Sequence, residues 1–124
     1  MTVVLGGAYQ GKNAYICEEL GISRDDTYFC TGRGIDPEKK AVVGLHVFSY
    51  ACTMAGIEPV DELRRLCGNL EGRVYAADEI SCGVVPMDAR MREWREAHGR
   101  MMNTLAKEAD SVVRLFCGIP QVIK

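Results

Sequence analysis

The sequence predicts a three-layer α/β fold in which a mostly parallel, reduced sheet is flanked by helices. Two observations predict this class: short β-rich runs alternate with helix-length segments along the chain, and the first run leads through glycines into a helix. A third observation sets the size. The chain has 124 residues, 48% of them hydrophobic, which is enough for the core of one domain over residues 1–124.

The first strand, residues 2–5, opens into a glycine-rich loop and then a helix that ends by Gly21. The loop fits G-x-x-x-x-G-K-[ST] at Gly6, Gly11 and Lys12. In that pattern backbone N–H groups cradle phosphate, the lysine reaches the terminal phosphates and the hydroxyl holds Mg²⁺. The order strand, loop, helix favours a P-loop-type fold that binds GTP or ATP over a plain strand-to-helix turn. The nucleotide-binding residues predicted here are Gly6, Gly7, Ala8, Tyr9, Gln10, Gly11, Lys12 and Asn13.

Asn13 departs from the pattern, because it stands where the Mg²⁺-binding hydroxyl belongs. Its amide oxygen is still a hard ligand, but the amide is bulkier than a hydroxymethyl group, and Mg²⁺ requires near-ideal octahedral geometry. We therefore expect phosphate binding to survive this change better than metal-assisted catalysis.

A second strand, residues 27–31, ends at Thr31, Gly32 and Arg33. Ligands of open α/β sheets lie beyond the carboxyl ends of strands, so we expect these three residues to border the nucleotide as well. Asp36 and a following proline then predict one helix from there to residue 54, apolar on most faces and buried against the sheet or another subunit. His46 lies within it.

A helix is predicted over residues 59–67, followed by a third strand over residues 73–77. That strand delivers Asp78 and Glu79 at its carboxyl end. Two carboxylates there suit a nucleotide-bound Mg²⁺ or the orientation of a hydroxyl nucleophile. A helix-capping or solvated acidic loop is the alternative. The predicted metal ligands are Asn13, Asp78 and Glu79.

The longest predicted helix covers residues 89–109, with Asp88 as its N-cap. Apolar side chains recur along it at three- and four-residue steps, interrupted by His98, while its basic residues occupy other faces and are expected to be solvated. A fourth strand over residues 111–117 and a short β-like tail at residues 121–124 close the chain.

Composition excludes several classes of function. The formal net charge of −2 gives no basic excess for nucleic acid, and no apolar run approaches the ~20 residues that span a bilayer. The six cysteines form no C-x-x-C pair and are interpreted as small buried hydrophobic residues. These features predict a cytoplasmic protein.

Three blocks of sequence resemble the bifunctional adenosylcobinamide kinase / adenosylcobinamide-phosphate guanylyltransferase of cobalamin biosynthesis. The glycine loop is similar to that family's G-G-A-x-S-G-K-S, with Gln10 and Asn13 in place of both serines. Residues 79–86 are similar to N-E-V-G-x-G-I-V-P, with Asp78 in place of asparagine. Residues 92–120 resemble R-x-F-R-D-x-x-G-R-x-N and A-D-E-V-x-x-V-x-x-G-I-P.

This resemblance implies phosphorylation of a corrinoid hydroxyl and then GMP transfer through a histidine-linked intermediate, with Lys12 and His46 as catalytic residues. A differently placed gap instead matches residues 45–55 to a helix of the family in which His46 has no catalytic counterpart, and His46 is then a packed helix residue. The chain is accordingly either a shortened enzyme or a catalytically silent nucleotide-binding or assembly protein. The resemblance also implies a trimer, and we expect a homo-oligomer held through the apolar helix of residues 38–54.

Overall fold

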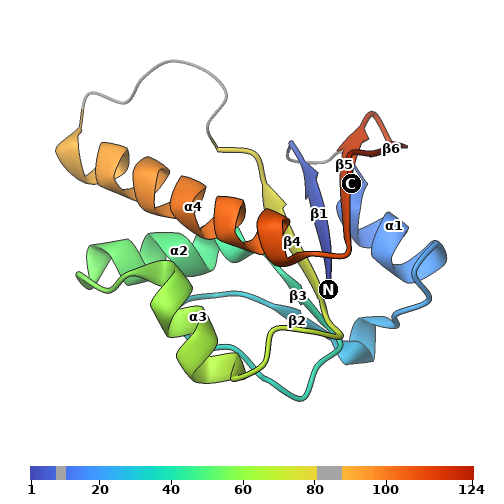
Figure 1. The fold of residues 1–124 in the computed structure, drawn as a ribbon, viewed down its shortest axis with the longest axis horizontal. Coiled ribbons are helices and arrows are strands. Elements are labelled where there is room, and N and C mark those ends of the chain that lie inside the picture. The colour runs from blue at the N-terminus through green and yellow to red at the C-terminus, as the bar shows by residue number, and fades with distance from the viewer. Residues whose placement is uncertain (8–10, 81–87) are drawn as a thin grey trace.

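The computed structural model describes residues 1–7, 11–80 and 88–124, and it has the predicted α/β class (Figure 1). Six strands form one sheet in the order β2-β3-β4-β1-β5-β6, parallel except for β6, which runs antiparallel to β5. The strands are β1 (Thr2–Gly6), β2 (Thr27–Phe29), β3 (Ala41–Val43), β4 (Val74–Asp78), β5 (Ser111–Phe116) and β6 (Ile119–Val122). The helices are α1 (Lys12–Glu18), α2 (Leu45–Met54), α3 (Pro59–Cys67) and α4 (Ala89–Glu108), with a 3-10 turn at Arg24–Asp26.

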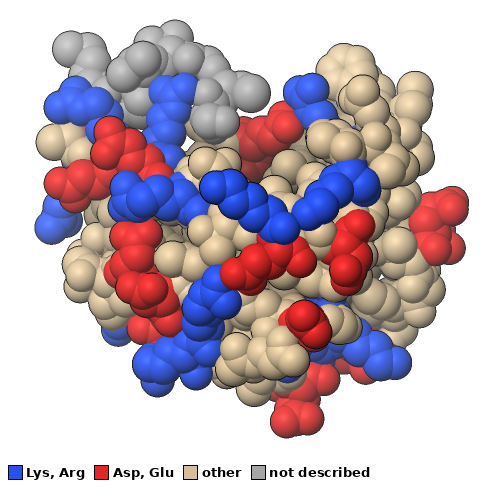
Figure 2. Space-filling view, in the orientation of Figure 1, with Lys and Arg blue, Asp and Glu red and all other residues tan. Residues whose placement is uncertain are grey.

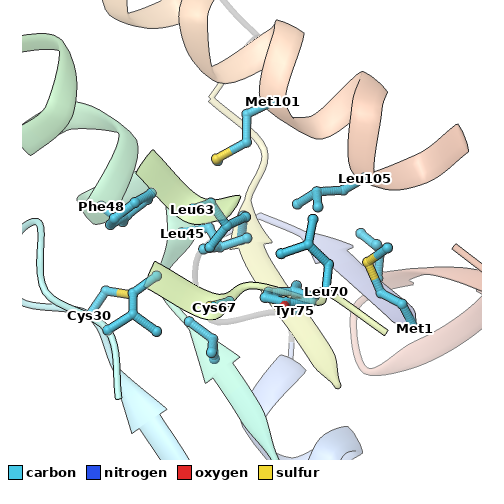
Figure 3. Close-up of a cluster of buried hydrophobic side chains, with 14 of the residues drawn as sticks. Met1, Cys30, Leu45, Phe48, Leu63, Cys67, Leu70, Tyr75, Met101 and Leu105 are labelled. Atoms are coloured by element: carbon cyan, nitrogen blue, oxygen red, sulfur yellow. The ribbon is translucent and has the colours of Figure 1, made fainter. Parts of the chain in front are cut away.

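Helices cover the two faces of the sheet unequally. Successive strand side chains point to opposite faces, and Val3 accordingly belongs to the core under α2, α3 and α4, whereas the next residue, Val4, packs with Ile16 of α1. Figure 3 shows the larger core, in which Met101 and Leu105 of α4 lie over Tyr75 of β4. Three helices on one side and one on the other make the third layer thin (Figure 1).

The long helix predicted from residue 36 to 54 is wrong in its first half. Ala41–Val43 form β3, which lies between β2 and β4 in the sheet, and only Leu45–Met54 are helical. Between them Gly44 takes φ 87°, a left-handed conformation that glycine adopts without steric cost. The β-branched pair Val42 and Val43 favours a strand, and pairing with β2 and β4 decides it.

The same correction removes the surface through which we expected subunits to associate. In α2 the residues Leu45, Phe48, Ser49 and Cys52 are buried within this chain, so its apolar side faces the core rather than a partner. The exposed large residue of this helix is Tyr50, whose ring meets Trp94 of α4 edge-on at 5.3 Å between centroids. The predicted homo-oligomer is therefore left without its structural argument.

The carboxyl-terminal half follows the sequence closely. Asp88 caps α4 as predicted, its side chain accepting a hydrogen bond from the Arg90 N–H at 2.7 Å. The predicted tail strand begins two residues earlier than expected, at Ile119: β6 forms a hairpin with β5 through Cys117 (φ 50°) and Gly118 (φ 77°). Two consecutive residues with positive φ fit the right-handed twist of a two-residue hairpin.

Charged side chains of both signs are interspersed over the face that carries α2, α3 and α4 (Figure 2). Some of them join helices: Arg100 of α4 holds both carboxylate oxygens of Glu58 at 3.1 and 3.0 Å, and Arg64 of α3 pairs with Glu108. The predicted solvated face of α4 thus also ties it to α3.

Of the six cysteines, Cys82 lies outside the described residues, and the other five divide into two groups. Cys30, Cys52 and Cys67 are buried as predicted, whereas the prediction is wrong for Cys17 and Cys117, which are exposed. Burial raises the pKa of the Cys30 thiol to about 12 and that of Cys52 to about 11, so both stay protonated and chemically inert. In the part of the chain that the structure describes, no helix is long and apolar enough to cross a membrane.

Candidate functional site

The site lies where β1 and β4 end side by side. In this parallel pair Gly6 is directly opposite Asp78, and the Glu79 N–H donates to the Gly6 carbonyl at 2.9 Å. The carboxyl ends of parallel strands share one edge of the sheet, which is the edge where open α/β proteins bind ligands. The residues that follow β1 and the acids that end β4 therefore meet at one place.

Lys12, the first residue of α1, reaches back across this edge. Gly11 precedes it with φ 91°, so the chain turns sharply into the helix. The Lys12 ammonium donates to the carbonyls of Gly7 at 2.8 Å and Gly6 at 3.3 Å, and it lies 2.6 Å from Oδ1 of Asp78. The Lys12 side chain is 8% exposed and that of Asp78 is 27% exposed, so the lysine is buried and the aspartate keeps contact with water.

His46, the second residue of α2, meets the same aspartate. The Asp78 N–H donates to His46 Nδ1 at 3.1 Å, and His46 Nε2 lies 3.5 Å from Asp78 Oδ2. Burial lowers the pKa of the His46 imidazole, and the Lys12 charge adds to that effect, while the Asp78 charge opposes it. Lys12, Asp78 and His46 thus form one cluster drawn from α1, β4 and α2.

Behind His46 lies a buried polar network that joins α2 to α4. Ser49 Oγ donates to the His46 carbonyl at 3.1 Å, accepts from Trp94 Nε1 at 2.9 Å and lies 2.7 Å from Nδ1 of His98. A hydroxyl carries one proton, so a Ser49 that donates to the carbonyl requires His98 to present Nδ1–H. Burial lowers the pKa of His98 to about 4, which keeps this ring neutral.

Glu79, the residue after Asp78, contacts β5 instead of this cluster. Its carboxylate pairs with Arg114 of β5, with Arg114 Nε 2.9 Å from Glu79 Oε1. The arginine is the feature that sequence reasoning missed. The register of β1 with β5 places Arg114 beside Leu5, one residue before the sheet edge. The sequence did not indicate this position, because no motif in it reports strand order.

The predicted metal ligands do not gather into a protein-only cage. Across residues 1–7, 11–80 and 88–124, no group of three or more His, Cys, Asp or Glu side chains is placed to hold a metal ion. Asn13 is exposed and lines a hollow of about 340 Å³ between α1 and β2. Mg²⁺ in nucleotide sites binds one or two carboxylates and completes its coordination shell with phosphate and water oxygens. The single carboxylate of Asp78 is therefore enough for such a site.

The remaining predicted residues lie farther off or outside the described chain. Thr31, Gly32 and Arg33 follow β2, which β3 and β4 separate from β1. Three inter-strand steps place them about 14 Å from the glycine loop at about 4.8 Å a step. Ala8, Tyr9 and Gln10, and the segment 81–86 that carries part of the family resemblance, lie outside the described residues.

Two comparisons with known proteins bear on this geometry. A family model described as cobinamide kinase / cobinamide phosphate guanyltransferase matches residues 57–123, more than half of the chain. A search of curated proteins finds no match. The matched range supplies Asp78, Glu79 and Arg114 to the site, whereas Lys12 and His46 come from the part of the chain before it.

Proposed function

The chain belongs to the cobinamide kinase / cobinamide phosphate guanyltransferase family, and on that premise we propose that it binds GTP or ATP with Mg²⁺ at the edge formed by β1 and β4. One observation carries the proposal: the Lys12 ammonium lies 2.6 Å from Oδ1 of Asp78, at the ends of two neighbouring parallel strands. A lysine after a glycine loop and an aspartate on the adjacent strand are the groups that hold the phosphates and the metal in P-loop nucleotide enzymes.

Each residue has a definite task in this proposal. Lys12 exchanges its bonds to the Gly6 and Gly7 carbonyls for phosphate oxygens and keeps a positive charge where negative charge accumulates. Asp78 holds the metal, directly or through water, with the carboxylate that it now turns to Lys12. Mg²⁺ bound with the nucleotide supplies charge neutralisation of the transferring phosphoryl group.

The reaction that follows from the family is phosphoryl transfer to the hydroxyl of a corrinoid alcohol, and we propose it as the activity of this chain. We place it ahead of GMP transfer through His46, because it uses the contact between Lys12 and Asp78 on which the proposal rests. In GMP transfer a nucleophilic imidazole needs one nitrogen turned to the phosphorus, and Nδ1 of His46 already accepts from the Asp78 N–H, which leaves Nε2 for that role.

A second candidate function is nucleotide binding without turnover. The observation that favours it is Asn13, which replaces the hydroxyl of the phosphate loop and is exposed at the start of α1. The two candidates separate in one assay. Release of ADP or GDP that depends on cobinamide supports the kinase, whereas tight nucleotide binding with no such release supports the silent protein.

Calorimetry with Mg²⁺-GTP and Mg²⁺-ATP tests the binding proposal. We expect Lys12→Ala to weaken binding by roughly 1.5–3 kcal/mol, the worth of a charge-assisted contact, or about 10- to 150-fold. The matched control is Lys40→Ala, because Lys40 is 69% exposed and pairs only loosely with Asp26 at 3.8 Å. Equal affinities for the wild type and Lys12→Ala, or no binding by the wild type, would remove the proposal.

A further inference from the structure

Arg114 is the one charged residue of β5, whose sequence is S-V-V-R-L-F. This strand lies inside the sheet, between β1 and β6, and the residues on either side of Arg114 are buried. A charged side chain in such a strand calls for a partner. Arg114 has one in Glu79: Arg114 Nη2 donates to Glu79 Oε2 at 3.3 Å, and Arg114 Nε lies 2.9 Å from Glu79 Oε1.

This ion pair crosses the end of β1. β1 lies between β4 and β5, and the register of β1 with β5 places Arg114 beside Leu5. On the other side of β1, the Glu79 N–H donates to the Gly6 carbonyl at 2.9 Å. The two side chains therefore meet across β1 where that strand passes into the glycine loop.

Asp78 and Glu79 belong to opposite faces of the sheet. Ala76 packs in the core beside α1, and Ala77 packs in the larger core under α2, α3 and α4. Because side chains alternate along a strand, Asp78 continues the first face and Glu79 the second. Each acid has a cation of its own, since Asp78 Oδ1 lies 2.6 Å from the Lys12 ammonium and Glu79 pairs with β5. The charges of the two pairs cancel.

This balance affects an anion bound at the glycine loop. Without Arg114, the Glu79 carboxylate is an uncompensated negative charge beside the loop, and it repels phosphate. It is also free to leave its face of the sheet, and Mg²⁺ in nucleotide sites accepts one or two carboxylates. Loss of Arg114 therefore weakens the binding of metal-free nucleotide and increases the dependence of binding on Mg²⁺.

We propose that Arg114 is a positioning residue of the nucleotide site, which holds Glu79 on the α4 face of the sheet and cancels its charge, so that the metal and the phosphates meet Asp78. This inference rests on the proposed nucleotide site. It gives Arg114 an effect on nucleotide affinity that passes through Glu79 and needs no contact with the nucleotide.

A double-mutant cycle between Arg114 and Glu79 tests this coupling, with affinities for GTP and ATP measured by calorimetry in EDTA and in Mg²⁺. Arg114→Met keeps the apolar stem and removes the charge. We expect it to weaken metal-free binding about fivefold and to raise the ratio of affinities with and without Mg²⁺ about threefold. Adding Glu79→Gln restores the charge balance and should return both quantities to within about twofold of the wild type. Arg114→Lys keeps the charge and should stay within about threefold.

The matched control is Arg64→Met, because Arg64 is 45% exposed and Arg114 is 44% exposed, and Arg64 pairs with Glu108. It should leave both affinities unchanged. Urea unfolding verifies that each variant is folded, and Arg114→Gln replaces Arg114→Met if the latter is not.

Three results decide the inference. If the double variant binds metal-free nucleotide as weakly as Arg114→Met, the effect does not pass through Glu79 and the inference is overturned. If the wild type binds nucleotide and Arg114→Met binds it equally well, only the positioning role fails. If the wild type binds no nucleotide, the proposed function fails together with this inference.

Discussion

The chain has two parts that contribute differently to the site. Residues 57–123, which match the family, hold α3, β4, α4, β5 and β6 and supply the acids at the end of β4. The residues before them hold β1, α1, β2, β3 and α2 and supply Lys12 and His46. The comparison teaches that the family match identifies the scaffold and the acidic edge, while Lys12 and His46, to which the proposed chemistry assigns roles, come from the other part.

The two parts are nevertheless interleaved within one sheet. β1 lies between β4 and β5, and β3 lies beside β4. The larger core likewise takes Phe48 from α2 and Leu63 and Met101 from α3 and α4. Because neither part has a sheet or core of its own, we expect both to unfold together as one domain.

The largest effect is expected from truncating the core where the two parts meet. Phe48 of α2 is fully buried, so we expect Phe48→Ala to lower the free energy of unfolding by about 3–5 kcal/mol. Urea unfolding followed by both far-ultraviolet circular dichroism and Trp94 fluorescence measures this change. The two probes should give one coincident transition.

Tyr50→Ala serves as the control, since this aromatic residue of the same helix is 43% exposed. Its expected cost is about 0.5–1.5 kcal/mol, the worth of its edge-on contact with Trp94. Two separate transitions in the wild type, or equal costs for the two variants, contradict the view that the parts share one core.

The next effect concerns His98, which joins the parts through Ser49. Burial lowers its pKa from 6.5 to about 4, so between these pH values the unfolded chain binds a proton that the folded chain does not. The stabilisation is fully present above pH 6.5 and is lost as the pH falls toward 4. The loss amounts to at most about 3 kcal/mol for this group.

Urea unfolding at pH 7 and at pH 4.5 measures it, in the wild type and in His98→Asn. The variant keeps a polar atom near Ser49 but does not titrate, so its loss of stability on acidification should be smaller than that of the wild type. The difference between the two proteins isolates His98 from other titrating groups. Equal losses in both would show that His98 is not responsible.

A smaller effect is expected at Asn13, in the part outside the family match. Asn13→Ser supplies the hydroxyl that the phosphate loop otherwise uses for Mg²⁺. Nucleotide affinity in the presence of Mg²⁺ should rise by about two- to tenfold, the range of one added polar contact. Calorimetry with and without Mg²⁺ shows it, and an unchanged Mg²⁺ response means that Asn13 does not limit the metal.

The smallest effect is expected at Glu79, inside the matched part. Its pairing with Arg114, which is 44% exposed, leads us to expect Glu79→Gln to change the free energy of unfolding by less than about 1 kcal/mol.

Asp78→Asn should reduce the Mg²⁺-dependent nucleotide affinity about tenfold. A larger loss of that affinity in Glu79→Gln than in Asp78→Asn would assign the metal to Glu79 instead.

The fold class and the elements at both ends were predictable, because their signals are local. Asp88 caps α4, and the glycine loop turns β1 into α1, each within a few residues of sequence. The strand β3 was missed because its three residues are too few for a period to show, and because its conformation is decided by β2 and β4 on either side.

The site was predictable in its parts but not in its assembly. The motif singled out Lys12 and the strand end singled out Asp78, yet their contact follows from β1 and β4 being neighbours, which sequence order does not state. The orientation of His46 depends on Gly44, Ser49 and Asp78, residues that share no motif. Contacts between distant elements are set by topology, and topology was the part that local patterns could not supply.

The central claim, a nucleotide site at the edge of β1 and β4, is tested most directly by amide chemical shifts on titration with Mg²⁺-GTP and Mg²⁺-ATP. The account predicts saturable shifts at Gly6, Gly7, Lys12, Asp78 and Glu79, with small changes in α3 and the carboxyl-terminal half of α4. The absence of shifts at these five residues at millimolar nucleotide, or shifts confined to the α3 and α4 face, would contradict it.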